Sequence, residues 1–336
     1  MGREVVKERG VGGGIEKSTG SSLQPSALSP QPSNPAMTSG LTSVIIVAAD
    51  SGDELGYCVD SVMAASGAIE VVVSDNASSD GSVSALPARW SNEPRLHIVH
   101  NGANLGFGAG CNRGAAAASG DALVFLNPDC RVQADTIARL RSIADGDSRI
   151  GLIGARVVGM DGKPEPASRR RDPLLRRAVS SLTGAARWQS RWPWLCGINL
   201  PAPDATAIIE DVDAVSGAAM HVPRVVFDKL GGFDEGYFLH CEDLDLCRRV
   251  RDAGFRVVCA NDVIVQHAKG TSSRSRPLFV ARHKHRGMWR WFTKFDPAAR
   301  NPLLRVLVWL GIWAHFVVLA PVYLSRAARW RVSGSD

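Results

Sequence analysis

The stretch Asp121 to Asp129, DALVFLNPD, ends in an amide, a proline and a carboxylate after five apolar residues. The apolar run predicts a strand buried on both faces, and Pro128 helps to end it because proline cannot donate a ladder hydrogen bond. Asp129 offers the hard oxygen ligands that Mg²⁺ and Mn²⁺ prefer. Asn127 and Asp129 are therefore candidates for a metal–phosphate site, and a plain Asn-Pro-Asp turn is the alternative.

Two other segments concentrate carboxylates. In the segment 75–81, DNASSDG, small polar residues favour a turn and can cap the helix that follows. Glu242, Asp243 and Asp245 place three carboxylates within four residues at the predicted start of a helix. The helix dipole favours negative charge there, so a simple cap is the alternative, but three carboxylates exceed what one cap needs.

Glycines are dense in the segment 104–110, NLGFGAG. Residues without a Cβ let the backbone approach a ligand closely. The segment lacks the G-x-G-x-x-G spacing of the dinucleotide fingerprint, which disfavours a Rossmann dehydrogenase. The sequence predicts a ligand-contacting loop here, followed by a helix that includes the alanines 115–118.

Apolar periodicity predicts alternating strands and helices along the first half of the chain. Leu55, Cys58, Val59, Val62 and Met63 follow the i, i+3, i+4, i+7, i+8 spacing of one helix face. The predicted strands of this half are 43–49, 70–74, 97–99 and the strand of DALVFLNPD. Such alternation indicates an α/β protein with a mostly parallel sheet.

The second half is predicted to continue the sheet after a break. A helix is expected at 135–144, a strand at 150–155 with a turn at 161–162, and a long irregular insertion at 163–205 that is either a surface excursion or an acceptor-side wall. The remaining predicted elements are a strand at 211–222 interrupted at 216–217, a helix from 242 that stops at Gly254, and strands at 256–259 and 263–267.

Composition limits the class of protein. Seven scattered cysteines and the lack of an N-terminal apolar leader favour reduced thiols in the cytoplasm. The net charge of +6 is uneven, with one arginine cluster at 169–177 and a basic segment at 274–294. Such patches suit phosphates, acidic head groups or nucleic acid, so a nucleic-acid-binding protein is the alternative from a different class.

The two ends of the chain differ from its middle. Residues 1–40 are rich in Gly, Ser and Pro and are predicted to be disordered. Near the other end, 19 residues from Val306 to Leu324 contain no Lys, Arg, Asp or Glu. This length is just sufficient to span a bilayer, but a helix that lies in or dips into the cytoplasmic leaflet is favoured. A buried core helix is the alternative.

The motifs VVVSDNASSDGS, NLGFGAGCNRG, FLNPD, GGFDEGYFLHCEDLDLCRR and HAKGTS occur in this order within a region that covers roughly Ser43 to Thr271. In this order they resemble the family 2 inverting glycosyltransferases of GT-A fold, in particular the bacterial rhamnosyltransferase-like branch. The resemblance implies a Rossmann-like, mostly parallel central sheet flanked by helices. It also implies a catalytic domain at 41–275, with a nucleotide-binding half at 41–130 and an acceptor half at 131–275. The remaining segment, 276–336, is then a basic and apolar helical region that associates with the membrane.

The resemblance also implies roles for individual residues. Asp243 is the expected general base, with Glu242 and Asp245 on the acceptor side. Asp129 is the metal-binding end of the family's D-x-D element, whose first position is Asn127 here, and His267 is a further metal or phosphate ligand. The residues expected to bind the donor nucleotide are Asp75, Asn76, Asp80, Asn104, Gly106 and Asn127.

The same resemblance implies substrates. It predicts transfer of L-rhamnose from dTDP-L-rhamnose, with Mg²⁺ or Mn²⁺, to N-acetylglucosamine on a polyprenyl diphosphate. The product belongs to the linkage unit of cell-wall arabinogalactan, and the enzyme is expected at the cytoplasmic face of the membrane, without a nucleic-acid partner. No motif reads the sugar, so another nucleotide sugar such as UDP-galactofuranose is an alternative donor. The oligomeric state is left open.

Overall fold

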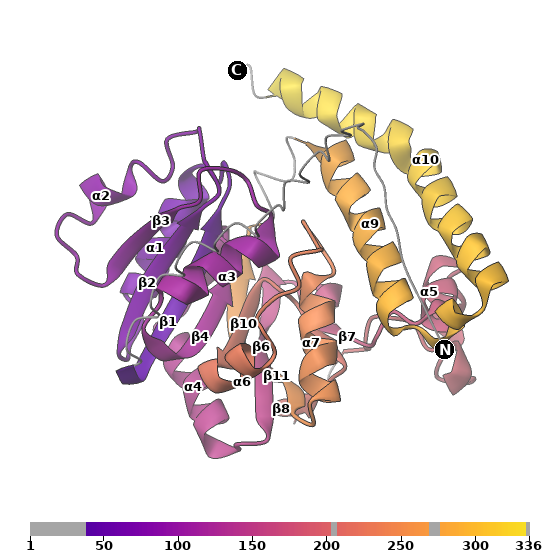
Figure 1. Cartoon of the computed structure of the whole chain (residues 1–336), viewed down its shortest axis with the longest axis horizontal. Helices are drawn as coiled ribbons and strands as arrows, with labels where there is room; N and C mark the ends of the chain where they lie inside the picture. The colour runs from indigo at the N-terminus through magenta and orange to yellow at the C-terminus, as the bar shows by residue number, and fades with distance from the viewer. Residues whose placement is uncertain (1–37, 203–206, 269–275, 334–336) are drawn as a thin grey trace, which may run out of the picture. The chain divides into compact units, whose positions relative to one another are not determined.

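A nine-stranded sheet organises this computed structural model, which describes residues 38–202, 207–268 and 276–333. The strand order is β3-β2-β1-β4-β10-β6-β11-β5, and β8 pairs with β11 (Figure 1). The strands are β1 (Thr38–Ala48), β2 (Ile69–Asp75), β3 (Leu96–His100), β4 (Gly120–Leu126), β5 (Cys130–Val132), β6 (Ile150–Gly159), β8 (Ile209–Asp211), β10 (Ala219–Pro223) and β11 (Arg256–His267).

The first four strands form a parallel block. β1 pairs in parallel with both β2 and β4, and β2 pairs in parallel with β3. The later part is mixed, because β10 lies antiparallel between β4 and β6 while β6 and β11 are parallel. The expected α/β sheet is therefore confirmed. Its pairing is parallel throughout the first half of the chain, and antiparallel strands are added beside the parallel pair β6–β11 in the second half.

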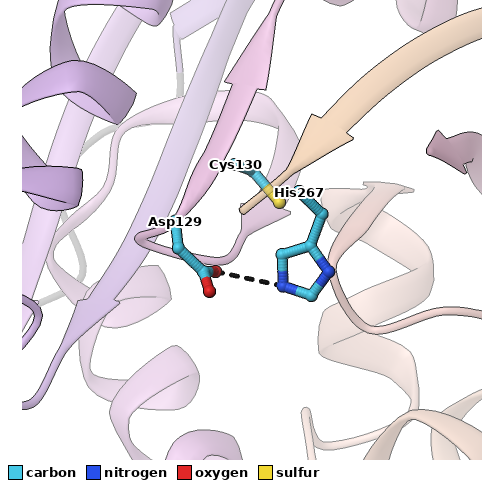
Figure 2. Close-up of side chains that lie close together, drawn as sticks. All are labelled: Asp129, Cys130 and His267. Atoms are coloured by element: carbon cyan, nitrogen blue, oxygen red, sulfur yellow. Dashed lines mark ion pairs between the residues drawn. The ribbon is translucent and has the colours of Figure 1, made fainter. Parts of the chain in front are cut away.

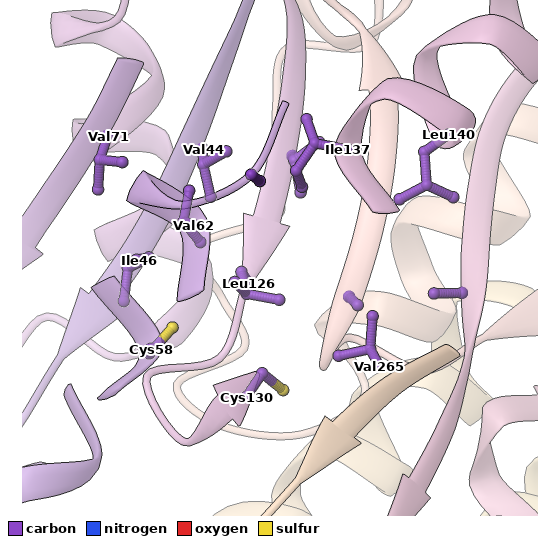
Figure 3. Close-up of a cluster of buried hydrophobic side chains, with 14 of the residues drawn as sticks. Val44, Ile46, Cys58, Val62, Val71, Leu126, Cys130, Ile137, Leu140 and Val265 are labelled. Atoms are coloured by element: carbon purple, nitrogen blue, oxygen red, sulfur yellow. The ribbon is translucent and has the colours of Figure 1, made fainter. Parts of the chain in front are cut away.

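Two helical layers cover the sheet, because successive side chains of each strand point to opposite faces. In β1, Val44 and Ile46 pack with α1 (Asp53–Met63) and α4 (Thr136–Gly146) in one core cluster, part of which is drawn in Figure 3. Ile45 and Val47 pack on the opposite face with α3 (Phe107–Ala117), α6 (Arg224–Lys229) and α7 (Glu242–Asp252). The five residues predicted to form one face of α1 are all buried.

Helix α3 begins earlier than predicted, at Phe107, so the glycine-rich segment is helical in its second half. The reason is packing, since a Cβ on Gly114 would lie 2.5 Å from Cγ2 of Ile45, and one on Gly110 would lie 2.7 Å from Cγ1 of Val47. These glycines let α3 lie directly on β1. The predicted turn at 161–162 is confirmed, because the Gly159 amide donates to the Lys163 carbonyl.

The insertion at 163–205 has more structure than predicted. It contains β7 (Arg169–Arg170), which pairs with β9 (Ala214–Val215) in a separate two-stranded sheet, and α5 (Leu175–Leu182). The predicted strands 256–259 and 263–267 form one strand, β11, with a register shift between Ala260 and Ile264. Of the predicted disordered segment, residues 1–37 lie outside the described residues, and 38–40 begin β1.

The C-terminal region consists of two long helices that pack together, α9 (Pro277–Phe295) and α10 (Pro302–Ser333) (Figure 1). In α10, the segment Pro302–Ser325 is long and apolar enough to cross a membrane, with a mean hydropathy of 2.0. Most of its large apolar side chains are exposed, and Ile312 is a buried exception. The alternative of a buried core helix is therefore not supported.

The close contact between α3 and β1 predicts a stability difference between two glycine substitutions. We expect Gly114→Ala to lower the free energy of unfolding by about 1–3 kcal/mol, because the added methyl group overpacks against Ile45. Gly146→Ala in α4 is the matched control, since a Cβ there meets nothing within 4 Å. Urea unfolding measures both, and equal stability of the two variants would contradict this account of α3 packing.

Candidate active site

A cavity of about 1770 Å³ opens at the carboxyl ends of the parallel strands. Asp50 follows β1, Asn76 follows β2, and Asn127 and Asp129 follow β4, and all four line it. The chain leaves β1 toward β2 and later returns to pair β4 on the other side of β1, which makes this edge a topological switch point. Such points are the usual ligand sites of open α/β sheets.

An amide network forms the wall beyond β2. Asn76 Nδ2 donates to the Gly106 carbonyl at 3.0 Å, and the Gly106 amide donates to Asn104 Oδ1 at 3.0 Å. Gly106 has φ +88°, and a Cβ there would collide with the Phe238 carbonyl. The network therefore fixes three predicted donor-binding residues against the loop before α7, and all three line the cavity.

Opposite this wall, Asp129 and His267 point toward one another (Figure 2). His267 Nε2 lies 3.1 Å from Asp129 Oδ1, and its Nδ1 lies 3.0 Å from Glu165 Oε1. Asn127 Nδ2 is 3.4 Å from His267 Nε2. Cys130 is close to this pair, but it is fully buried and its thiol donates to the Ala218 carbonyl at 3.4 Å.

The donor set fits a divalent cation. Burial alone lowers the pKa of His267, but the hydrogen bonds and charges of Asp129 and Glu165 outweigh burial and raise that pKa to about 9. A carboxylate behind the second imidazole nitrogen is the usual support for a metal-binding histidine. Mg²⁺ and Mn²⁺ prefer oxygen ligands to thiolates, and the buried Cys130 thiol donates to the Ala218 carbonyl, so Cys130 is not expected among the ligands. Asp129 and His267 are thus the residues that could hold a cation.

The second group of carboxylates lines the same cavity at the start of α7. Glu242 and Asp243 are the first residues of this helix and are both buried. His240 and Cys241, just before them, have φ of +67° and +73°. Non-glycine residues rarely adopt this left-handed conformation, and such strain is typical of functional sites. The turn directs both carboxylates to the cavity.

Asp243 is held from three sides. Its Oδ2 forms an ion pair with Arg170 and accepts from the Gly217 amide at 3.0 Å, while its Oδ1 accepts from its neighbour's amide, that of Leu244, at 2.8 Å. Burial raises the pKa of Asp243, but the Arg170 charge and these hydrogen bonds outweigh it and lower the pKa below the usual value. Asp243 is therefore ionised at neutral pH.

Glu242 behaves differently although it is adjacent. Burial, with the Asp243 charge as the second cause, raises the pKa of Glu242 to about 8. Its Oε2 is buried without a hydrogen-bond partner among the residues that the structure describes. Two buried carboxylates side by side thus divide into one anion and one neutral acid.

Three predicted site residues lie outside the cavity lining. Asp245 is fully buried and forms ion pairs with Arg249 at 2.5 Å and Lys294 at 2.6 Å. It points away from Asp243 because two residues along a helix rotate the side chain by about 200°. Asp75 and Asp80 instead hold the loop beyond β2. Asp75 accepts from the Ser78 amide at 2.8 Å, and Asp80 accepts from the Gly52 amide at 2.7 Å. The structure does not bring these three carboxylates to the cavity.

Sequence reasoning missed Arg170, Glu165 and Asp50. In the sequence, Arg170 stands out only as part of the arginine cluster 169–177. A buried, ionised Asp243 needs a cationic partner, but the sequence does not indicate which arginine it is. Glu165 lies in the segment predicted to be irregular. Asp50 had the same signal as Asn127, a polar residue directly after a buried strand, and it accepts from the Ser79 amide at 2.8 Å at the cavity edge.

Comparison with known proteins agrees with this geometry. Residues 43–196 match the family model "Glycosyl transferase family 2". The chain is 29% identical over 262 residues to the N-acetylglucosaminyl-diphospho-decaprenol L-rhamnosyltransferase of Mycobacterium tuberculosis, covering 70% of this chain and 83% of that protein. It is 31% identical over 144 residues to the rhamnosyltransferase WbbL of Escherichia coli, covering 42% of this chain and 49% of WbbL.

The fold also has solved counterparts. The mannosyltransferase PcManGT from Pyrobaculum calidifontis, solved with GDP-Man and Mn²⁺, superposes with a TM-score of 0.54 at 18% identity over 93% of this chain and 79% of that one. The fold is that of GT-A glycosyltransferases, and the sequence similarities make this chain a glycosyltransferase. Residues 43–196, just under half of the chain, are thus similar to glycosyl transferase family 2. The nucleic-acid-binding alternative does not account for this site.

The raised pKa of Glu242 predicts a pH dependence of stability. Between the unfolded pKa of about 4.5 and the folded value of about 8, only the folded state keeps the proton. Stability therefore falls as pH rises through this range, by at most about 1.4 kcal/mol per pH unit for one proton. Glu242→Gln cannot ionise, so we expect its stability relative to wild type to increase from pH 5 to pH 8.

Urea unfolding at pH 5, 6, 7 and 8 measures this difference. Glu235→Gln is the matched control, because Glu235 is exposed and its substitution leaves the buried pair intact. Parallel pH profiles of wild type and Glu242→Gln would mean that Glu242 does not hold its proton in the folded protein.

Proposed function

We propose that this glycosyltransferase transfers L-rhamnose from dTDP-L-rhamnose to N-acetylglucosamine carried on a polyprenyl diphosphate, with inversion of the anomeric centre. The observation that carries the proposal is that Asn127, Asp129 and His267 line the same cavity as Glu242 and Asp243. The similarity to the M. tuberculosis enzyme, over most of that enzyme's length, supports the sugar and the acceptor.

The proposed reaction needs one base and one site for the leaving diphosphate. Asp243 is the proposed base: it takes the proton of the acceptor hydroxyl as the oxygen attacks the anomeric carbon, and the bond to the nucleoside diphosphate breaks on the opposite face. Arg170 keeps Asp243 ionised for this role, and the Gly217 amide orients its carboxylate. Burial and the Asp243 charge raise the pKa of Glu242 to about 8, so Glu242 is less suited than Asp243 to act as the base at pH 7.

The leaving diphosphate requires compensation of its charge. Asp129 and His267 would hold a divalent cation, Mg²⁺ or Mn²⁺, which neutralises the departing diphosphate. Glu165 would then accept a hydrogen bond from His267 Nδ1 and keep Nε2 directed to the cation. Asn76, Asn104 and Gly106 would contact the nucleotide along the opposite wall.

The acceptor and α10 support a proposed location at the membrane. A polyprenyl diphosphate stays in the membrane, and the apolar exposed segment of α10 supplies a surface that lipid can cover. Basic residues of 276–294 add attraction to an anionic leaflet. We place the enzyme at the cytoplasmic face of the membrane, in the synthesis of a cell-wall linkage unit such as that of arabinogalactan.

A donor panel tests the proposed reaction. Purified protein is incubated with a polyprenyl-diphosphate N-acetylglucosamine acceptor and dTDP-L-rhamnose, UDP-galactofuranose or GDP-mannose, and products are identified by mass. We expect a deoxyhexose product from dTDP-L-rhamnose alone. A product from UDP-galactofuranose in its place would establish the alternative donor.

Asp243→Asn tests the assignment of the base in the same assay. We expect turnover to fall about a hundredfold or more, the effect of lost general-base catalysis, while dTDP binding is retained. Asp252→Asn, at the exposed end of the same helix, is the matched control and should keep its turnover. Near-normal turnover of folded Asp243→Asn would show that another group takes the proton.

The cation site has a test that does not depend on turnover. Titration calorimetry should show that Mn²⁺ binds to wild type. The Mn²⁺ affinity of Asp129→Ala and of His267→Ala should be lower by about tenfold or more. Cys130→Ala should bind as wild type does, because its thiol is occupied by the Ala218 carbonyl. Binding should tighten as pH rises toward 9, since the cation displaces the His267 proton. Full activity of wild type in EDTA would exclude a cation from the reaction.

A further inference from the structure

The cavity is larger than its proposed donor requires. Ligand cavities for small molecules commonly measure about 300–1,000 Å³, and this one measures about 1770 Å³. Its polar half lies at the strand ends, where Asn76, Asn127 and Asp129 gather. The other half extends away from the sheet edge between helices that the proposed chemistry does not use.

That second half is an apolar groove walled by three helices. α5, α9 and α10 contribute the side chains that line it, which include Leu175, Val179, Leu182, Met288, Leu307 and Ile312. Val179 and Leu182 are about half exposed or more, at 48% and 64%. His285 of α9 and His315 of α10 hold the two helices together through ring nitrogens 2.9 Å apart. The groove and the carboxylates of α7 belong to one continuous cavity.

Cationic side chains stand among the lining residues of the same cavity. Arg170, Arg276 and Lys284 all line it. Arg170 pairs with Asp243, whereas no ion pair of Arg276 or Lys284 occurs within the described ranges. An occupant with an anionic group and a long apolar part would match this combination of charge and groove.

We propose that the groove between α5, α9 and α10 binds the polyprenyl chain of the acceptor, with the acceptor's diphosphate held by Arg276 and Lys284. This inference rests on the proposed function and adds to it the site of the lipid. Apolar contact with the groove draws the chain in, and the cations fix the diphosphate. The sugar hydroxyl is thereby held at Asp243, so the groove determines which acceptors react.

Gly311→Phe tests the groove directly. Gly311 lines the cavity, and a Cβ there meets nothing within 4 Å, so the backbone accepts a side chain at this position. Val317→Phe is the matched control, because Val317 is 66% exposed on α10 and does not line the cavity. Kinetics are measured with N-acetylglucosaminyl diphosphates that carry a long polyprenyl chain, a short one or a simple alkyl group.

We expect Gly311→Phe to raise KM for the long-chain acceptor about tenfold, the effect of losing about two buried methylene contacts. Its kcat and its KM for the alkyl acceptor should stay near wild-type values. Val317→Phe should match wild type with every acceptor. Both variants should sediment with anionic phosphatidylglycerol vesicles as wild type does, which separates the groove from the membrane-facing surface.

Leu182→Asp on α5 provides an independent variant if Gly311→Phe does not fold. It should also raise KM for the long-chain acceptor, because a charge replaces an apolar side chain in the groove. For the diphosphate, Lys284→Ala should raise KM for all three acceptors. Arg286→Ala, an exposed neighbour on α9 outside the lining, should not.

The outcomes separate the two proposals. Long-chain kinetics unchanged in folded Gly311→Phe and Leu182→Asp would overturn the groove while leaving rhamnosyl transfer intact. Equal use of long-chain and alkyl acceptors by wild type would also overturn it. Absence of any rhamnosylated product from wild type with all three acceptors would overturn the proposed function itself.

Discussion

Two carboxylates buried side by side at the start of α7 impose the constraint on which the site depends. Only one of them can be charged there, because burial penalises each anion and each penalises the other. Arg170 decides which one, since it pairs with Asp243, whereas no ion pair of Glu242 occurs in the part of the chain that the structure describes. Strand β7 of the insertion carries Arg170. The charge division between the two carboxylates therefore depends on β7 lying beside the start of α7.

The same requirement explains features that look unrelated along the chain. Gly217 lies just before β10, and its amide donates to the Asp243 carboxylate. A Cβ on residue 217 would lie only 3.2 Å from the Cβ of Asp243, so glycine permits this close approach. The left-handed residues His240 and Cys241 turn the chain so that α7 begins at the cavity. On the other side, β11 carries His267 to the Asp129 carboxylate that follows β4. Each element ends or bends where it brings one polar group to the strand ends.

The elements with strong periodicity were predictable from sequence, and the contacts between distant segments were not. The spacing of Leu55 to Met63 identified α1, and the run before Asn127 identified β4, because burial on defined faces leaves a pattern in the sequence. Asn127, Asp129 and His267 were named as candidates and do lie together.

What sequence reasoning lacked was the pairing partner and the rotation of each side chain. Arg170 carries no periodic signal, and its role depends on β7 pairing with β9, which is 44 residues away in the Arg170–Ala214 register. Asp245 belongs to the same acidic run as Asp243 but turns into a separate ion-pair cluster with Lys294 of α9. Long-range pairing decides the case of Arg170 and is not encoded locally. The helical phase of Asp245 follows from its spacing to Asp243, so that rotation could have been worked out once the helix start was identified.

Helix α10 is apolar on more than one face, which distinguishes it from a helix that packs on the protein with one side only. A helix in an interface has a polar face toward water, yet from Val306 to Leu324 α10 has no charged side chain. Leu307 and Ile312 face the cavity, while Val306, Val317 and Val318 are exposed away from its lining. Ile312 is buried, but Leu307 and the outer set are largely exposed. If acyl chains cover the outer set and a polyprenyl chain covers the inner one, both sides of the helix are accounted for by lipid, and the acceptor passes from membrane to Asp243 without leaving an apolar surface.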